Sequence, residues 1–244
     1  MSEHAYSTAT MSRVRAGGGE PRHGAGEALG VAGLCVLGLA LVWSLANLVP
    51  GLQLRDSIAL HDFTLLSRPR IDAIADFLLH LLDPLEFVLW AVALVAVALA
   101  RERPRVALAV AAVMALAPLT TEKLKPLLAH PHVAFEGTYV GPASWPSGHS
   151  TAALALVLCA VLVTPARLRA LVGVIGAGFA LAVGVSLLIL AWHMPSDVLG
   201  GYLVATCWAA LAVAALRAAE RRWPTRPDSE PARGLPPEPP QPSV

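Results

Sequence analysis

The sequence predicts an all-α membrane protein, a polytopic bundle of six transmembrane helices with a further amphipathic helix at the membrane interface. Composition is the first indication: 56% of the 244 residues are hydrophobic and 14% are charged, whereas a soluble domain carries about 25% charged residues. The second is that the apolar residues form separate stretches, each near the ~20 residues with which a helix crosses the hydrocarbon core. With a net charge of +1 and no basic run, the chain is not expected to bind nucleic acid.

Six apolar stretches are predicted to cross the membrane, and they define one domain from residue 28 to residue 222. The stretches are Ala28–Val49, Pro84–Ala100, Arg105–Thr121, His149–Thr164, Ala170–Ala191 and Val198–Leu216. The first is too long for the apolar region of a secretory signal, so we expect it to remain as an anchor. Residues 1–27 and the proline-rich residues 223–244 are predicted to be disordered cytoplasmic tails.

Basic residues predict the orientation of these helices. They concentrate in the N-terminal segment, in two of the connections and after the last helix: Arg13, Arg15, Arg22, Arg101, Arg103, Arg105, Arg167, Arg169, Arg217, Arg221, Arg222, Arg226 and Arg233. By the positive-inside rule, this side and both termini face the cytoplasm. The other three connections, residues 50–83, 122–148 and 192–197, are then predicted to lie at the outer face of the cell membrane.

The first outer connection is predicted to contain the amphipathic helix. Its polar residues, Asp72, Asp76, His80 and Asp83, recur at helical spacing opposite an apolar face. Carboxylates and a histidine on one face can bind a metal ion, but a solvated polar face explains the same spacing without a ligand. We therefore assign no metal site here.

Polar residues collect at the outer ends of the predicted helices. They are Lys123, Lys125, His130, His132, Ser147, Gly148, His149, Ser186, His193 and Asp197. An ionisable side chain at membrane depth costs about 2.5–3.5 kcal/mol and is a functional candidate by default. Because these residues come from segments far apart in the sequence, one shared outer site is the simplest explanation of their placement.

The turn at residues 146–149 predicts an anion-binding helix start. Ser147 is the expected N-cap, and Gly148 follows it at the first position of the helix. Free N–H groups and the positive end of the helix dipole suit a phosphate group. Lys123 adds a full positive charge from the end of the neighbouring helix.

His193 and Asp197 are predicted to form a nucleophilic pair. Three residues separate them, so the carboxylate can reach one imidazole nitrogen, fix the tautomer and make the other nitrogen nucleophilic. His149 is then available to protonate a leaving oxygen. These groups predict phosphoryl transfer with neither a metal nor another cofactor. Gly200 and Gly201, which follow, are predicted to let another helix pack closely.

Three segments of the chain together resemble a known family signature. The segments are Lys123-x6-His130-Pro131, Ser144-Trp145-Pro146-Ser147-Gly148-His149-Ser150 and Ser186-Leu187-x5-His193-x3-Asp197. They look like the signature of the type 2 phosphatidic acid phosphatases, Lys-x6-Arg-Pro, Pro-Ser-Gly-His and Ser-Arg-x5-His-x3-Asp. These lipid phosphate phosphatases share a histidine-based site with vanadium haloperoxidases. The order, the spacing and the common membrane face of the segments all agree.

The resemblance implies a helical-bundle enzyme that removes phosphate from a phosphorylated lipid at the outer leaflet. By similarity, His193 attacks phosphorus and forms a phosphohistidine, and Asp197 orients it. His149 protonates the leaving alcohol and then activates water. The phosphate oxygens are bound by Lys123, Ser147, Gly148 and His130.

Two positions depart from the family signature. Its first arginine is replaced by His130 and its second by Leu187, and loss of one preorganised oxyanion donor costs about 10²–10³ in rate. Lys125, a protonated His130, or Arg68 and Arg70 from the first outer loop are candidates to supply the missing charge.

Two other functions stay open at this point. A catalytically weak or inactive protein of the same fold would bind or transport lipid phosphates, since fold and function separate easily. A metal-dependent hydrolase would be built on five residues of the outer site, namely His130, His132, His149, His193 and Asp197. Their spacing matches no recognisable ligand set.

Overall fold

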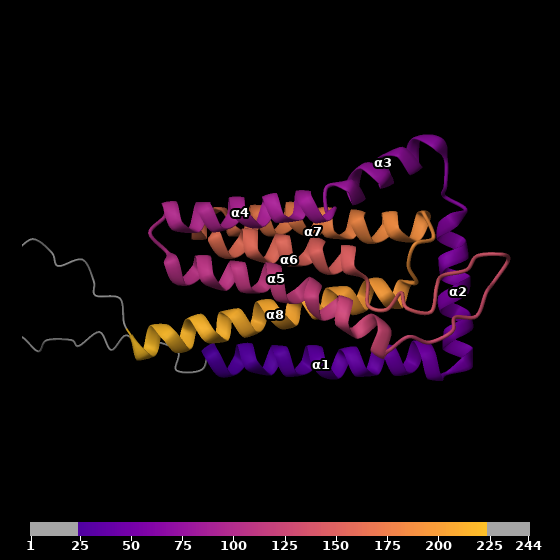
Figure 1. The fold of residues 1–244 in the computed structure, drawn as a ribbon, viewed down its shortest axis with the longest axis horizontal. Helices are drawn as coiled ribbons and strands as arrows, with labels where there is room; N and C mark the ends of the chain where they lie inside the picture. Colours follow the sequence, from indigo (N-terminus) through magenta and orange to yellow (C-terminus); the bar gives the residue numbers. More distant parts are fainter. Residues whose placement is uncertain (1–23, 224–244) are drawn as a thin grey trace, which may run out of the picture.

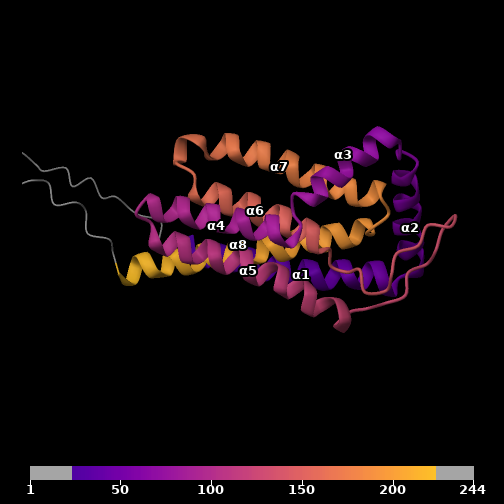
Figure 2. The ribbon, with the colours of Figure 1, turned by 45° about the horizontal axis from the view of Figure 1, so that its top comes forward.

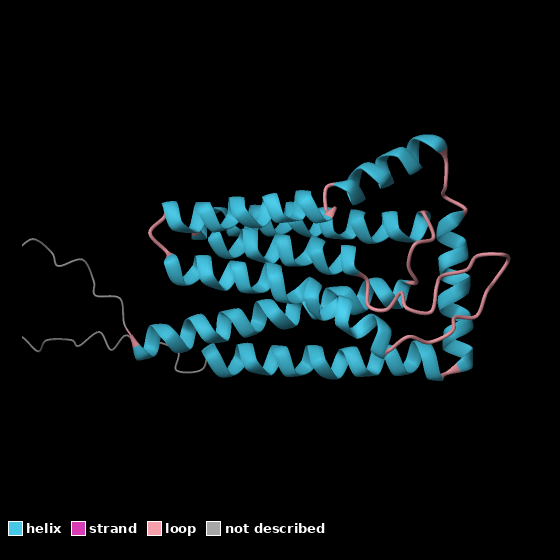
Figure 3. Cartoon of the chain, in the orientation of Figure 1, coloured by secondary structure: helices cyan, strands magenta, loops and turns pink. Residues whose placement is uncertain are grey.

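The computed structural model describes residues 24–223, and its regular elements are all helices (Figure 3). They are α1 (Gly24–Leu48), α2 (Pro50–Thr64), α3 (Pro69–His80), α4 (Pro84–Ala100), α5 (Pro104–Leu127), α6 (Gly148–Val163), α7 (Ala166–Ile189) and α8 (Pro195–Arg222). The tails predicted at the two termini lie outside the described residues except at their inner ends. α1 begins at Gly24 and so takes in the last four residues of the first tail, and Trp223, the first residue of the second tail, follows α8.

Proline defines the start of most of these helices. α2, α3, α4, α5 and α8 each have proline in the first turn, where its missing N–H costs nothing and its fixed φ suits the helix. α6 begins differently, because the Ser147 side chain accepts a hydrogen bond from the Ser150 N–H. This confirms the predicted N-cap.

α6 is the central helix of the bundle. It contacts α4, α5, α7 and α8, and α1 packs along α8 on the outside (Figures 1 and 2). Many of the buried side chains of α6 and of the neighbouring α5 are small, among them Ala153, Ala155 and Ala117. Small side chains allow the close approach by which helices associate in membranes.

The bundle is that of a multi-pass membrane protein. α1, α5, α7 and α8 are each long and apolar enough to cross a membrane, and α3 with α4 passes the same test as a pair bent by 54°. α6 is apolar but has only 16 residues. Length and composition thus support four or five of the six predicted spans.

The first outer connection contains two helices, where one was predicted. α3 corresponds to the predicted amphipathic helix, and its polar face is used locally: Asp72 accepts hydrogen bonds from Ser67 Oγ and the Arg68 N–H. α2 was missed because the side that it turns to the protein is mixed: Gln53 and Ser57 are bonded to the α5–α6 connection, whereas Leu60 is buried in the core. Such a helix has no continuous apolar stripe to recognise.

The two ends of the bundle differ in composition (Figure 1). One end holds the α4–α5 and α6–α7 connections, the start of α1 and the end of α8, where the described basic residues concentrate. The other end holds α2, α3 and the long α5–α6 connection. The starts of α6 and α8 face this second end, and so do the residues of the predicted site.

Candidate active site

Three hydrogen bonds join the start of α6 to the start of α8. The Ser147 N–H donates to the Asp197 carbonyl at 3.0 Å. Ser150 Oγ donates to the Val198 carbonyl at 3.1 Å, and Thr151 Oγ1 donates to the carbonyl of Gly201 at 3.0 Å. The first turn of α6 is therefore bonded directly to the start of α8, although the paired residues are some 50 positions apart in the sequence.

Glycine at two positions makes this joint possible. A Cβ on Gly201 would lie 2.0 Å from Ser150 Oγ and 2.5 Å from the Ser147 carbonyl oxygen, and a Cβ on Gly200 would lie 2.8 Å from Trp145 Nε1. None of these three distances is compatible with a side chain at position 200 or 201. The prediction that these glycines serve close packing is confirmed.

His193 and Asp197 form a hydrogen-bonded pair at the start of α8. Nδ1 of His193 donates to Oδ2 of Asp197 at 3.3 Å, and the Met194 N–H donates to the same oxygen at 3.0 Å. The Asp197 side chain is fully buried, whereas that of His193 is 12% exposed. This arrangement fixes the imidazole through Nδ1 and leaves Nε2 for chemistry.

His149 lies on the first turn of α6, close to this pair. Its ring packs edge-on against Trp192, the residue before His193, with 5.7 Å between ring centroids. The structure therefore brings the two histidines of the sequence prediction to one place, on either side of the α6–α8 joint.

Lys125 is the cation that lies beside the α6 N-terminus. An added Cβ on Gly148 would be 3.7 Å from Lys125 Nζ and 3.5 Å from Glu122 Oε1, and these two side chains form an ion pair of 2.6 Å. Lys123, which the sequence analysis favoured, is exposed and has no hydrogen-bond or ion-pair partner among the described residues. The difference follows from the helix, because α5 runs on to Leu127 and places the two lysines on different faces.

Neither of the two positions where the family signature has arginine provides an arginine-like donor beside His149 and His193. Leu187 is completely buried in the apolar core. The ring of His130 packs against Trp43 of α1 with centroids 6.5 Å apart, and no described contact joins it to His149 or His193. Arg68 donates to the carbonyl groups of its own turn at the start of α3.

α2 adds a residue that the sequence analysis did not identify. Asp56 accepts hydrogen bonds from the Ser196 N–H at 3.2 Å and from Ser196 Oγ at 2.6 Å. Ser196 lies immediately before Asp197, so this carboxylate caps the same turn that carries the His193 pair. Burial raises the pKa of Asp56, although the Ser196 hydrogen bonds oppose the shift.

The same face of α2 fixes the loop before α6. Gln53 Nε2 donates to the Pro131 carbonyl at 2.9 Å, and Ser57 Oγ donates to the Val133 carbonyl at 2.7 Å. His132 lies between Pro131 and Val133 in this loop, and its Nε2 is 3.0 Å from Ser144 Oγ. In the sequence, residues 53, 56 and 57 are polar residues at helical spacing, which could have indicated a polar helix face here, but the pattern matches no catalytic motif.

The His, Cys, Asp and Glu side chains of the site could also be metal ligands if enough of them lay together. Within residues 24–223, no group of three or more His, Cys, Asp or Glu side chains is placed to hold a metal ion. No three of the five residues of the metal-dependent alternative therefore form such a ligand group.

Comparisons with known proteins agree with the resemblance of the sequence motifs. Residues 106–221 match the model of the PAP2 superfamily. Among solved structures, the chain is similar to the crystal structure of a transmembrane PAP2-type phosphatidylglycerolphosphate phosphatase from Bacillus subtilis. The two share 20% sequence identity at a TM-score of 0.61, over 80% of this chain and 98% of the other, so the likeness is one of fold. A search of curated proteins gave no significant match.

Replacing Gly201 tests the α6–α8 joint. We expect Gly201→Ala to lower the free energy of unfolding by about 1–3 kcal/mol, because the new methyl group overlaps Ser150 and the Ser147 carbonyl. Thermal unfolding in detergent measures the effect. Gly178→Ala is the matched control, since nothing lies within 4 Å of a Cβ added at that position. Equal losses of stability in both variants would contradict the claim that close α6–α8 packing requires glycine at 201.

Replacing Asp56 tests the link from α2 to the same turn. Asp56→Ala leaves the half-buried Ser196 N–H and hydroxyl without their acceptor, so we expect a loss of about 1–3 kcal/mol in unfolding free energy. Asp62→Ala, on an exposed position of the same helix, should change little. Equal unfolding free energies of the two variants would contradict a stabilising role for the Asp56–Ser196 hydrogen bonds.

Proposed function

Since residues 106–221 match the PAP2 superfamily and the chain shares the fold of a PAP2-type phosphatase, we propose that this membrane protein is a lipid phosphatase. The observation that carries the proposal is the His193–Asp197 pair, held 3.3 Å apart at the α6–α8 joint beside His149. A paired histidine next to a helix N-terminus and a lysine is suited to nucleophilic attack on a phosphate.

In the first step, Nε2 of His193 attacks phosphorus and the bond to the lipid oxygen breaks. The attacking imidazole becomes positively charged, and the buried carboxylate of Asp197 stabilises that charge through Nδ1–H. His149 in its protonated form gives its proton to the leaving alkoxide. The products of this step are a lipid alcohol and a phosphohistidine.

In the second step, water replaces His193 on phosphorus. The now neutral His149 takes a proton from the water, whose oxygen attacks phosphorus as the N–P bond breaks. Inorganic phosphate leaves, and His193 regains its lone pair. No metal ion or other cofactor takes part in either step of this proposal.

The phosphate oxygens would be bound at the start of α6. The N–H groups that follow Ser147 provide donors and the helix dipole. We assign the full positive charge to Lys125, because it lies beside Gly148. Lys123 and His130, which the family signature would place in this role, make no described contact with the helix start.

The substrate would be a lipid phosphate monoester, such as a phosphatidate or phosphatidylglycerol phosphate, or a polyprenyl diphosphate. We propose that α1, α4, α5, α6, α7 and α8 all cross the membrane, with both termini in the cytoplasm. The arginines of the α4–α5 and α6–α7 connections and of the end of α8 support this orientation. The active site would then open at the outer face.

A weak or inactive lipid-phosphate binder of the same fold is the second candidate. The burial of Leu187 favours it, because that position cannot supply the cationic donor of the family signature. Binding of vanadate or of a lipid phosphate without turnover would distinguish this candidate from the phosphatase.

Removing the nucleophile tests the proposed reaction. Purified protein should release phosphate from lipid phosphates in the presence of EDTA, and His193→Ala should lower kcat by about 10³-fold or more. A thermal unfolding curve of the variant controls for folding. Turnover that persists in His193→Ala, or that stops on chelation, would contradict the mechanism.

Comparing the two lysines tests the assignment of the phosphate charge. We expect Lys125→Ala to lower kcat/KM by about 10²–10³-fold, as for other single oxyanion donors, and Lys123→Ala to have the smaller effect. Steady-state phosphate release with one lipid substrate measures both. A larger loss at Lys123 would contradict the assignment of the phosphate charge to Lys125.

A further inference from the structure

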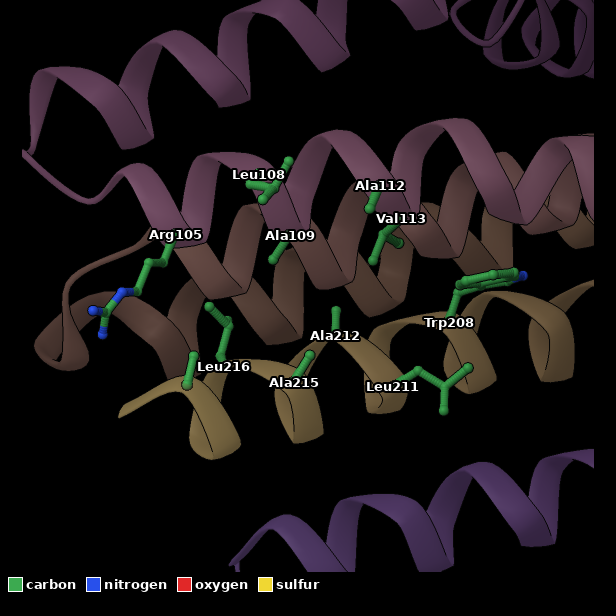
Figure 4. A pocket seen from close by; sticks show the side chains of 11 residues that line it. Arg105, Leu108, Ala109, Ala112, Val113, Trp208, Leu211, Ala212, Ala215 and Leu216 are labelled. Carbon is green, nitrogen blue, oxygen red and sulfur yellow. The ribbon is translucent and has the colours of Figure 1, made fainter. Parts of the chain in front are cut away.

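An apolar groove runs between α5 and α8 (Figure 4). It lies toward the start of α5 and the end of α8, at the end of the bundle opposite the candidate active site (Figure 1). It has a volume of about 410 Å³ and a floor of small side chains, including Ala109, Ala112, Ala212 and Ala215. Arg105 lies at one end and Trp208 at the other (Figure 4). The indole N–H of Trp208 has a hydrogen-bond partner there, because Nε1 donates to Thr120 Oγ1 at 3.0 Å.

The length of the groove matches one leaflet of the membrane. From Arg105 to Val113 it extends about 12 Å along α5, and from Trp208 to Ala219 about 16 Å along α8. Half of a hydrocarbon core of ~30 Å is about 15 Å. A groove with these limits begins at the polar surface and ends near the middle of the membrane, as does a lipid acyl chain.

At the charged end of the groove, most of the N–H donors of Arg105 have no partner among the described residues. Arg105 uses one guanidinium N–H on the Trp223 carbonyl, at 2.8 Å, while a guanidinium has five N–H donors. Within residues 24–223, no carboxylate lies within ion-pair distance of Arg105. The guanidinium of Arg222 lies over the ring of the same Trp223, 5.2 Å from its centroid, so a second cation is close.

Two other grooves of about 450 Å³ differ from this one in charge. The groove between α1, α6 and α8 is lined by both Arg217 and Glu27, whose side chains are 4.0 Å apart. The groove between α4 and α5 is lined by apolar residues such as Phe87 and Ala96. Of these three grooves, that between α5 and α8 alone joins an apolar channel to an unneutralised cation.

We propose that the α5–α8 groove binds one acyl chain of an anionic phospholipid, whose headgroup phosphate is held by Arg105. Basic pockets between transmembrane helices recognise anionic headgroups in this way. This lipid is not the substrate, because the groove lies at the start of α5 and the end of α8, whereas the catalytic residues lie at the other end of both helices. The proposal therefore does not depend on the proposed function.

Lipid binding to the full, delipidated chain in detergent tests this site. Native mass spectrometry would compare phosphatidylserine with phosphatidylcholine of the same acyl chains, neither of which is a phosphate monoester. We expect one tightly bound phosphatidylserine, with affinity lowered about fivefold by Arg105→Gln, since one arginine near the surface contributes about that much. Ala112→Leu and Ala215→Leu, which fill the groove from its two sides, should each abolish that bound lipid.

Ala96→Leu is the matched control, because it adds the same volume to the uncharged groove between α4 and α5. It should leave phosphatidylserine binding unchanged. Equal binding of the two lipids, or tight binding that survives both groove-filling variants, would overturn the proposal. So would a dimer that is lost in Ala112→Leu and insensitive to lipid, since the groove would then be an interface between two copies of the chain.

Discussion

The close contact between the starts of α6 and α8 is the constraint on which the rest of the structure depends. It needs a glycine at 201, because a single methyl group there would meet Ser150 and the Ser147 carbonyl. Given that contact, hydroxyl groups of α6 satisfy carbonyl groups of α8. The N-terminus of α6, proposed to bind the phosphate, is thereby held against the start of α8, which carries the His193–Asp197 pair. Neither helix alone would bring a nucleophile to a phosphate.

α2 supports this contact from outside the bundle. Its Asp56 accepts hydrogen bonds from Ser196 in the first turn of α8, and its Gln53 and Ser57 donate to carbonyl groups of the connection that leads into α6. The turn that carries the proposed catalytic pair is therefore supported by hydrogen bonds to α2. Positioning of this kind matters because misplacement of a reacting group by about 1 Å can cost 10²-fold in rate.

The parts of the site with local signals were predictable from the sequence, and the parts that depend on tertiary contacts were not. The Ser147 cap and the glycine pair have characteristic residues at fixed spacing, and the structure confirms both. Lys123 and Lys125 are two positions apart, about 200° around a helix, and only the packing of α5 on α6 selects Lys125. Asp56 carries no motif, because its partner Ser196 lies 140 residues away.

The scarcity of charge in the chain gives its few charged groups separate tasks at the two ends of the bundle. At the end that carries the His193–Asp197 pair, the proposed mechanism is distinguished by a covalent intermediate on His193. Rapid acid-free quenching during turnover of a radiolabelled lipid phosphate, followed by peptide mapping, tests it most directly. The account predicts an acid-labile, base-stable label on the peptide that contains His193. Steady turnover without a labelled protein, or a label on another residue, would contradict it.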